Sequence, residues 1–112
     1  MAKINSRAKG QRGERAICKI LVARGYTRAK RGIQTRGGGA EVPDVVNGIP
    51  GYHLEVKWQE TLHMDKWSAQ AENDAPEDQV PAVVYRRSRQ PWRISLKFDD
   101  FLDLLDKAND KN

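Results

Sequence analysis

The sequence predicts a single domain of the α/β class, an α+β sandwich in which a mixed β-sheet is flanked by helices. Its 112 residues leave room for one modest hydrophobic core. Short runs rich in β-branched and aromatic residues alternate with segments of helical periodicity. Their order along the chain is α-β-β-β-α-β-β-α, which places helices on the outside of a sheet built around one hairpin.

The first predicted helix covers residues 10–24. It follows a basic segment, residues 1–9, that we expect to be a flexible arm. Gly25 provides the C-terminal stop of the helix. Glu14 borders the apolar stripe, and helix geometry alone favours an ordinary first-turn acid stabilised by the helix dipole. The positions that recur at three- and four-residue steps are Gly13, Ile17, Ile20, Leu21 and Arg24.

Residues 26–33 are predicted to form a strand, and residues 34–41 a loop. The loop contains three successive glycines, Gly37–Gly39, which would let its backbone approach a phosphate closely. No Lys-Ser/Thr pair follows them, so this is not the nucleotide-binding loop of P-loop proteins. The alternative interpretation is a plain flexible connection.

The centre of the predicted fold is an antiparallel hairpin. Its strands, Asp44–Val46 and Tyr52–Gln59, are separated by the turn-forming segment Asn47–Gly51. The second strand alternates strictly, and we expect its apolar face to be buried and its polar face to meet solvent or a ligand. The apolar face carries Tyr52, Leu54, Val56 and Trp58, and the polar face carries His53, Glu55, Lys57 and Gln59. On this face His53 is expected to be an ordinary surface residue.

The second half of the chain supplies a helix, two strands and a last helix. Residues 62–73 are predicted to be helical, with Leu62, Trp67 and Ala71 in the core, and residues 74–78 end that helix. Residues 80–85 form a buried strand, and residues 92–98 an alternating one. Asp99 is the expected N-cap of the last helix, residues 100–107. The apolar residues expected to dock this helix on the sheet are Phe101, Leu102, Leu104 and Leu105. Residues 10–107 thus form one domain, and residues 108–112 a frayed tail.

The chain is basic, with a formal net charge of +5 and a pI of about 9.6. Its positive residues concentrate in two blocks, Lys3–Arg36 and Arg86–Arg93, whereas the C-terminal tail is acidic. Such blocks favour a polyanionic partner, because phosphate contacts release condensed counterions. The alternative is an ordinary solvated surface. The residues we expect to contact a nucleic acid through their charge are Lys9, Arg12, Arg28, Lys30, Arg31, Arg36, Arg86, Arg87 and Arg89.

Composition also bears on location. No apolar run approaches the ~20 residues of a membrane span. No secretory signal is visible at the N-terminus. The single cysteine, Cys18, excludes an internal disulfide and is expected to be a small buried hydrophobe. We therefore expect a cytoplasmic protein with no membrane partner.

Two acids flank the hairpin turn symmetrically. Asp44 precedes it by about as many residues as Glu55 follows it, so their Cβ atoms should lie roughly 5 Å apart if opposite and roughly 7–8 Å apart if diagonal. Two carboxylates at that separation can hold a hard cation such as Mg²⁺, with the backbone carbonyl of Val56 as a further ligand. Lys57 can then orient an attacking water for phosphodiester hydrolysis. The alternative is that Glu55 and Lys57 form a solvated ion pair of little energetic value.

These residues resemble a known nuclease motif. Pro43-Asp44 followed by Glu55-Val56-Lys57 resembles the PD-(D/E)XK motif. The segment Lys9–Arg15 and the apolar helix after it are similar to the start of archaeal and phage-encoded Holliday junction resolvases of that superfamily. The resemblance extends from Lys9 to Leu105.

The resemblance implies a restriction-endonuclease-like fold and a Mg²⁺-dependent endonuclease, with Mn²⁺ as a substitute ion. It implies a homodimer that cuts two strands of a four-way DNA junction in a bacterial, archaeal or phage-infected cell. Asp44, Glu55 and Glu14 would be metal ligands, which reverses the interpretation of Glu14 from helix geometry. Lys57 would position the water. A functional hydroxyl residue and a functional glutamine of some relatives correspond most nearly to Thr35 and Gln70.

Three alternatives stay open at this point. A nuclease of the same superfamily could act on ordinary duplex DNA or on other branched DNA, since the motif encodes cleavage and not substrate shape. The short chain has little room for a separate recognition domain, which favours recognition of shape. The second alternative is a non-catalytic basic nucleic-acid-binding module, and the third a small structural protein that contacts RNA. Trp58, Trp67 and Trp92 could anchor a dimer interface or belong to the core.

Overall fold

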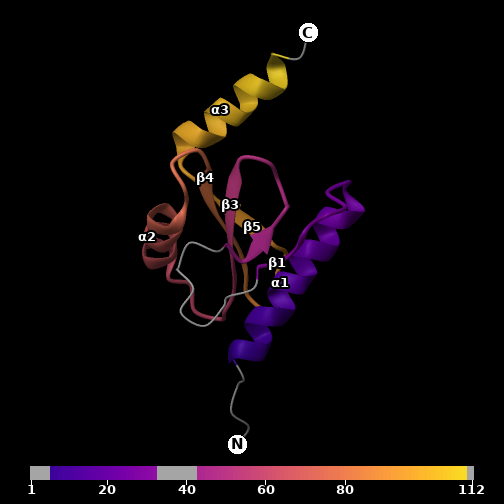
Figure 1. Ribbon diagram of the computed structural model, residues 1–112. Coiled ribbons are helices and arrows are strands. Elements are labelled where there is room, and N and C mark those ends of the chain that lie inside the picture. The colour runs from indigo at the N-terminus through magenta and orange to yellow at the C-terminus, as the bar shows by residue number, and fades with distance from the viewer. Residues whose placement is uncertain (1–5, 33–42, 111–112) are drawn as a thin grey trace, which may run out of the picture.

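The computed structural model describes residues 6–32 and 43–110. Its centre is a five-stranded mixed sheet with the strand order β1-β2-β3-β4-β5. The helices α1 and α2 lie on opposite sides of this sheet, and α3 extends away from one end of it (Figure 1). The elements are α1 (Ser6–Ala23), β1 (Lys30–Arg31), β2 (Val45–Val46), β3 (Tyr52–Trp58), α2 (Met64–Asp74), β4 (Val80–Arg86), β5 (Arg93–Ser95) and α3 (Phe98–Asn109). The predicted α+β class and element order are confirmed.

The strand β3 is the centre of the sheet. It pairs antiparallel with β2, where Val45 lies opposite Leu54, so the predicted hairpin is confirmed. On its other side β3 pairs parallel with β4 along its whole length, and α2 provides the crossover between the two strands. The strand β5 then returns antiparallel to β4. The C-terminal end of β3 and the C-terminal end of β5 therefore lie at opposite ends of the sheet.

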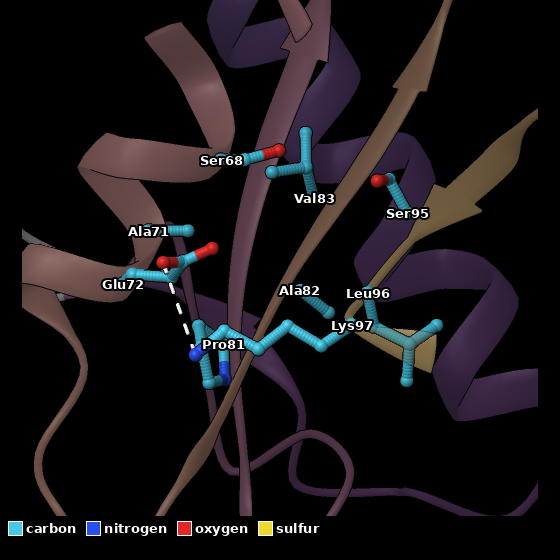
Figure 2. A pocket seen from close by; sticks show the side chains of 9 residues that line it. All are labelled: Ser68, Ala71, Glu72, Pro81, Ala82, Val83, Ser95, Leu96 and Lys97. Carbon is cyan, nitrogen blue, oxygen red and sulfur yellow. Dashed lines mark ion pairs between the residues drawn. The ribbon is translucent and has the colours of Figure 1, made fainter. Parts of the chain in front are cut away.

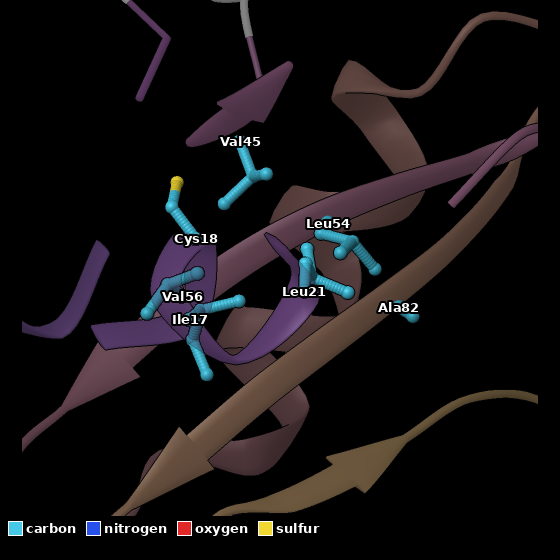
Figure 3. Packing of buried hydrophobic residues seen from close by; sticks show 7 residues of the cluster. All are labelled: Ile17, Cys18, Leu21, Val45, Leu54, Val56 and Ala82. Atoms are coloured by element: carbon cyan, nitrogen blue, oxygen red, sulfur yellow. The ribbon is translucent and has the colours of Figure 1, made fainter. Parts of the chain in front are cut away.

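Both faces of β3 are covered. On the α1 side, side chains from α1 pack on β2, β3 and β4, as Figure 3 shows for Ile17, Cys18, Leu21, Val45, Leu54, Val56 and Ala82. On the other side, Trp67 and Ala71 of α2 pack on Val83. His53 and Glu55 are buried under this second layer, with 0% and 4% exposure. The expectation that this face of β3 meets solvent is wrong, because a strand between two helices has no free face.

The helix α1 begins earlier than predicted and ends at Ala23, one residue before its predicted end. It starts at Ser6, so residues 6–9 are helical and not part of an arm. Arg7, Ala8 and Lys9 are strong helix formers, which explains the extension. Gly25 has φ +108° and follows the helix as its stop, and the Tyr26 N–H donates to the Leu21 carbonyl in the manner of a Schellman turn. Cys18 is buried as predicted, whereas Ile20 is 46% exposed.

The other differences concern the ends of elements. The strand expected over residues 26–33 is only Lys30–Arg31, because the Ala29 N–H turns back to the Tyr26 carbonyl. The helix α2 begins at Met64, which leaves Leu62 outside it and 38% exposed. It ends at Asp74, before Ala75 and Pro76, as predicted. The strand β5 is shorter than predicted and stops at Ser95. The glycine-rich loop, with Thr35 and Arg36, lies outside the described residues.

The last helix differs most from prediction. It begins at Phe98 with Lys97 as N-cap, and not after a cap at Asp99. None of its residues is buried, so the docking of Phe101, Leu102, Leu104 and Leu105 on the sheet is wrong for this structure. The helix leaves the sheet at the end of β5 and continues away from both layers (Figure 1). Among the described helices, none combines the length and hydropathy required to cross a membrane.

Candidate active site

An open cleft of about 490 Å³ lies where β2 and β3 meet α1. It brings together residues from four segments that are distant in the sequence: the first half of α1, the end of β1, the residue before β2 and the end of β3. Three of the four predicted catalytic residues, Glu14, Asp44 and Lys57, line this cleft, and the fourth, Glu55, is not among its lining residues. The other lining residues are Arg7, Gly10, Gln11, Arg31, Gly32, Val56, Trp58 and Gln59.

Asp44 is held at the edge of β3 by two hydrogen bonds. Its backbone N–H donates to the Leu54 carbonyl at 3.3 Å, and its Oδ2 accepts from the Val56 N–H at 2.7 Å. The register that places Val45 opposite Leu54 places Asp44 opposite Glu55 one residue further along. Residues directly opposite each other in an antiparallel pair project from the same face. Asp44 and Glu55 are therefore cross-strand neighbours.

The backbone carbonyl of Val56 faces the same edge. Gly51 and Gln59 of the β3 segment bond to β4, through the Val80 N–H to the Gly51 carbonyl and the Gln59 N–H to the Arg86 carbonyl. Alternate residues of a strand bond to alternate neighbours, so Val56 points to the β2 side. Pro43, just before Asp44, has no backbone N–H to offer this carbonyl. The carbonyl thus belongs to the oxygen donors of the cleft edge.

Both carboxyl groups have raised pKa values. Burial raises the pKa of Asp44 to about 6, and the charge of Glu14 adds to this, whereas the bond from Val56 N–H and the charges of Lys57 and Arg31 lower it. Burial also raises the pKa of Glu55 to about 8, with further increases from the charge of Asp44. The ionised forms of these two acids are therefore unfavourable unless positive charge is placed beside them.

Glu55 lies behind the cleft and contacts His53. The Nε2 atom of His53 is 3.1 Å from Glu55 Oε2, and both side chains are buried. Burial lowers the pKa of His53, which disfavours its charged form, and within the described residues its Nδ1 atom has no hydrogen-bond partner. The expectation of a surface histidine is wrong, because α2 covers this face of β3. The sequence did contain a signal: residues two apart on a strand share a face, so His53 and Glu55 had to be neighbours.

Glu14 reaches the cleft because α1 packs closely on β3. A Cβ atom at Gly13 would lie 3.4 Å from the Trp92 ring and 3.5 Å from Val56, so the helix backbone lies one van der Waals contact from the residues of the sheet side. Glu14 Oε1 accepts from Arg31 Nε at 3.0 Å. Arg31, expected to contact DNA, thus also neutralises an acid of the cleft.

Lys57 contacts the helix after the hairpin. Its Nζ donates to Gln70 Oε1 of α2 at 3.2 Å. The positive charge of Lys57 lowers the pKa of both Asp44 and Glu55. The structure therefore brings Gln70, which the sequence connected to the site only through resemblance, into direct contact with Lys57.

Three cations surround the Trp58 ring at the rim of the cleft. Lys9 and Arg12 of α1 lie 5.7 and 5.0 Å from its centroid, and Arg86 of β4 lies 4.7 Å away. Arg86 also lies 5.5 Å from the ring of Trp92, which meets Trp58 edge-on. Of the three tryptophans only Trp67 is fully buried, so it belongs to the core.

Glu60 connects this rim to the β4–β5 turn. It accepts hydrogen bonds from Lys9 Nζ and Ser88 Oγ, both at 2.7 Å, and from the Ser88 N–H. These donors lower the pKa of Glu60 to about 2. The Trp58 Nε1–H donates to the same serine hydroxyl at 3.3 Å. The network links α1, β3 and the β4–β5 turn into one positively charged rim, defined here as Lys9, Arg12, Trp58 and Arg86.

The other expected DNA contacts lie further from the cleft. Arg87 and Arg89 are exposed in the β4–β5 turn, and Arg87 and Arg86 line an adjacent basic groove of about 330 Å³. Lys30 is exposed on β1, and Arg28 lines a hollow beside the hairpin turn, at the opposite end of the sheet. The structure therefore divides the predicted basic surface into a rim beside the cleft and more distant charges.

The donor set fits a hard cation. Within residues 6–32 and 43–110, no three His, Cys, Asp or Glu side chains are gathered closely enough to hold a metal ion. Asp44 and Val56 nevertheless line the cleft, the buried Glu55 is the cross-strand neighbour of Asp44, and a third acid, Glu14, is held in the cleft by Arg31. All of these are oxygen donors, the type that Mg²⁺ prefers together with water.

Comparison with known proteins gives one match. A family model described as "Phage putative PDDEXK endonuclease" matches residues 5–112, nearly the whole chain. The match includes the helix, the hairpin and the strands that build the cleft. No curated protein and no solved structure matches the chain significantly.

Proposed function

The chain belongs to the family of phage PDDEXK endonucleases, and from that premise we propose that it is a Mg²⁺-dependent endonuclease that resolves four-way DNA junctions as a homodimer. Membership makes it a nuclease of the PD-(D/E)XK superfamily, whose members generally use a divalent metal and act on DNA. The ion, the branched substrate and the dimer are the parts that we propose. Residues 10–107 would form its nuclease domain.

The observation that carries the proposal is the hydrogen bond from Val56 N–H to Asp44 Oδ2. This bond joins the side chain of the aspartate in Pro43-Asp44 to the backbone of the segment Glu55-Val56-Lys57. We assign Asp44, Glu55, Glu14 and the Val56 carbonyl as metal ligands. When bound, the ion would neutralise charge on the scissile phosphate and make water more acidic. His53 would hold Glu55 in position, as partners of metal-binding carboxylates commonly do.

Lys57 is assigned to the attacking water. It lines the cleft beside Asp44, and its contact with Gln70 restricts where its ammonium can lie. An ammonium there donates hydrogen bonds to a water or to a phosphate oxygen. Gln70 would therefore act through Lys57 as a positioning residue.

The positively charged rim is the proposed contact to the DNA backbone. Lys9, Arg12 and Arg86 all lie within 6 Å of one ring centroid beside the cleft, so a strand entering the cleft would meet them. Arg87 and Arg89 extend this surface along the β4–β5 turn. Arg28, Lys30, Thr35 and Arg36 stay predictions for more distant contacts. The expected cytoplasmic location also stays a prediction.

The preference for junctions rests on size and resemblance. In a chain this short, a separate sequence-reading domain has little room, and the similarity of residues 9–15 to junction resolvases favours a branched substrate. Two copies related by a two-fold axis would suit paired cuts in a symmetric junction.

The direct test is cleavage of a synthetic four-way junction compared with a linear duplex of equal length, over a range of Mg²⁺ and Mn²⁺ concentrations. We expect nicking of the junction in preference to the duplex. Asp44→Asn should abolish cleavage and retain DNA binding, whereas Asp65→Asn, a change at an exposed acid of α2, should retain both. Equal cleavage of both substrates would favour a general duplex nuclease. Absence of metal-dependent cleavage on any DNA would leave the non-catalytic binding module.

A further inference from the structure

The helix α3 has an apolar face that nothing in the described chain covers. Phe98 is 72% exposed, and Phe101, Leu102, Leu104 and Leu105 are each about 40% exposed. Phe98, Phe101, Leu102 and Leu105 follow the i, i+3, i+4, i+7 spacing of one helical stripe. Five large apolar side chains gathered on one exposed helix mark an interaction surface, whereas single exposed ones would not.

The hollow at the base of α3, which includes Lys97, does not accept this face. It lies between α2 and the β4–β5 side of the sheet, has a volume of about 130 Å³, and is crossed by the Glu72–Lys97 ion pair (Figure 2). A space of this size holds about one aromatic ring and not five side chains. Leu96 and Lys97 form one of its walls and are also the whole connection from β5 to α3. The helix therefore cannot fold back into this hollow on so short a connection.

The charge of α3 excludes two classes of partner. Its sequence carries Asp99, Asp100, Asp103 and Asp106 against a single Lys107. Nucleic acid and anionic membranes would be repelled by that surface, although the rest of the chain is basic. The apolar stripe with an acidic opposite face is instead typical of a helix that pairs with another helix.

We propose that the apolar face of α3 packs antiparallel against the same face of α3 in a second copy of the chain. This inference rests on the homodimer of the proposed function and names its surface. Packed helices lie 8–10 Å apart, whereas the smallest extent of the molecule is 29 Å. In a parallel pair, the two sheet domains would lie at the same end of the paired helices and would overlap. In an antiparallel pair, the two domains lie at opposite ends.

The position of α3 is compatible with two working clefts. The cleft lies at the C-terminal end of β3, and α3 follows β5 at the other end of the sheet. Pairing through α3 therefore leaves both clefts open. A helix of 12 residues is about 18 Å long, so the interface is small and the dimer should be weak, with a dissociation constant on the order of 1–100 µM.

The first test is the molar mass of the full chain by sedimentation equilibrium from about 1 to 200 µM, without DNA or metal. We expect a monomer–dimer equilibrium, and Leu102→Asp should raise the dissociation constant at least ten-fold. Asp103→Asn changes the neighbouring residue on the polar face and should leave it unchanged or lower it. Leu102 is not buried in the monomer, so circular dichroism should show an intact fold for Leu102→Asp. A monomer at all concentrations, or a Leu102→Asp dimer, would overturn the proposal.

The second test is disulfide formation between single cysteines under mild oxidation. In the antiparallel pair Leu102 lies near the two-fold axis, so Leu102→Cys should cross-link to its own counterpart. The two copies of residue 98 would be about 10 Å or more apart along the helix axis, beyond the roughly 7 Å limit of a disulfide, so Phe98→Cys should not cross-link. The native Cys18 is buried and does not compete.

Cross-linking of Phe98→Cys would show a parallel pair, and a dimer without a Leu102→Cys cross-link would show a different interface. Either result contradicts the proposal.

Because both tests measure association of two copies and not cleavage, loss of the nuclease proposal would leave their results unchanged. If the wild-type chain instead co-sediments with anionic vesicles and does not self-associate, the partner of α3 is a lipid surface. That result would also overturn the inference.

Discussion

The side chain of Asp44 accepts a 2.7 Å hydrogen bond from the backbone N–H of Val56. This bond occupies a strand N–H that β2 does not reach, because β2 pairs with β3 only at Val45 and Leu54. It also sets the carboxylate at the cleft edge, although burial disfavours its ionised form. One residue thus completes the sheet and supplies the proposed metal ligand, and these two roles can be separated by substitution.

Asp44→Asn and Asp44→Ala should both abolish metal-dependent cleavage but differ in stability. Asparagine keeps an oxygen that can accept the Val56 N–H and removes a buried charge, so at pH 8 without metal this variant should be as stable as the wild type or more so. Alanine leaves the N–H without a partner and should cost about 1–3 kcal/mol of the free energy of unfolding. Urea denaturation of both variants would measure the difference. Equal stability would mean that the hydrogen bond contributes nothing.

The metal-free protein should lose stability as the pH rises. The folded-state pKa values of Asp44 and Glu55 are raised to about 6 and about 8, above the ordinary 3.8 and 4.5. Between those limits the native state binds more protons than the unfolded state, so the free energy of unfolding falls with pH. Each group contributes at most about 1.4 kcal/mol per pH unit, for a total on the order of a few kcal/mol between pH 5 and pH 9. Urea denaturation in the presence of a chelator would measure it.

The control for this pH dependence is a matched pair of glutamate substitutions. Glu55→Gln should remove most of the decline above pH 6. Glu60→Gln should leave it unchanged, because the pKa of Glu60 is lowered to about 2 and that group is ionised throughout the range. A wild-type stability that rises from pH 5 to pH 9 would contradict the raised pKa values of Asp44 and Glu55.

Much of the site could be predicted from local patterns. The breaker cluster at residues 47–51 predicts the hairpin, and the similar distances of Asp44 and Glu55 from it predict that they lie opposite each other across the two strands. The alternation of β3 places Glu55 and Lys57 on one face. These inferences succeed because strand period and hairpin register depend on neighbouring residues alone.

What could not be predicted depends on contacts between distant segments. His53 and Glu55 are buried because α2 crosses over to a parallel β4, and an alternating strand does not indicate whether its polar face is covered. The cations around Trp58 come from α1 and β4 and meet only in the fold. The amphipathic pattern of α3 correctly indicates an apolar face but not what that face packs against.

Metal binding should release protons near neutral pH. With a pKa of about 8, Glu55 is largely protonated at pH 7 before a cation arrives, and a ligating carboxylate must be ionised. Metal affinity should therefore increase from pH 6 to pH 8.5. Isothermal titration calorimetry with Mg²⁺ or Mn²⁺ in buffers of different ionisation enthalpy would give the number of protons released. In Glu55→Gln that number should fall, and an unchanged number would exclude Glu55 as the source.

Lys57→Ala should lower the single-turnover cleavage rate by about 10²-fold or more, because water positioning typically contributes that much. Gln70→Ala should have a smaller effect, about ten-fold, since it only frees the Lys57 ammonium. The apparent affinity for DNA should change little in either variant. Lys66→Ala, at an exposed residue one turn before Gln70, is the control. An effect of Gln70→Ala that persists in a Lys57→Ala background would mean that Gln70 acts independently of Lys57.

The positively charged rim should determine the salt dependence of DNA binding. If Lys9, Arg12 and Arg86 each contact a phosphate, replacing any one with glutamine should reduce the slope of log affinity against log salt by about 0.9. Lys66→Gln, a substitution in α2 away from the rim, should leave the slope unchanged. Trp58→Ala keeps every charge but removes the ring that the three cations share, so it should weaken binding with little change in slope. Fluorescence anisotropy from 50 to 300 mM salt would separate these effects, and equal slopes in all variants would exclude the rim as the DNA contact.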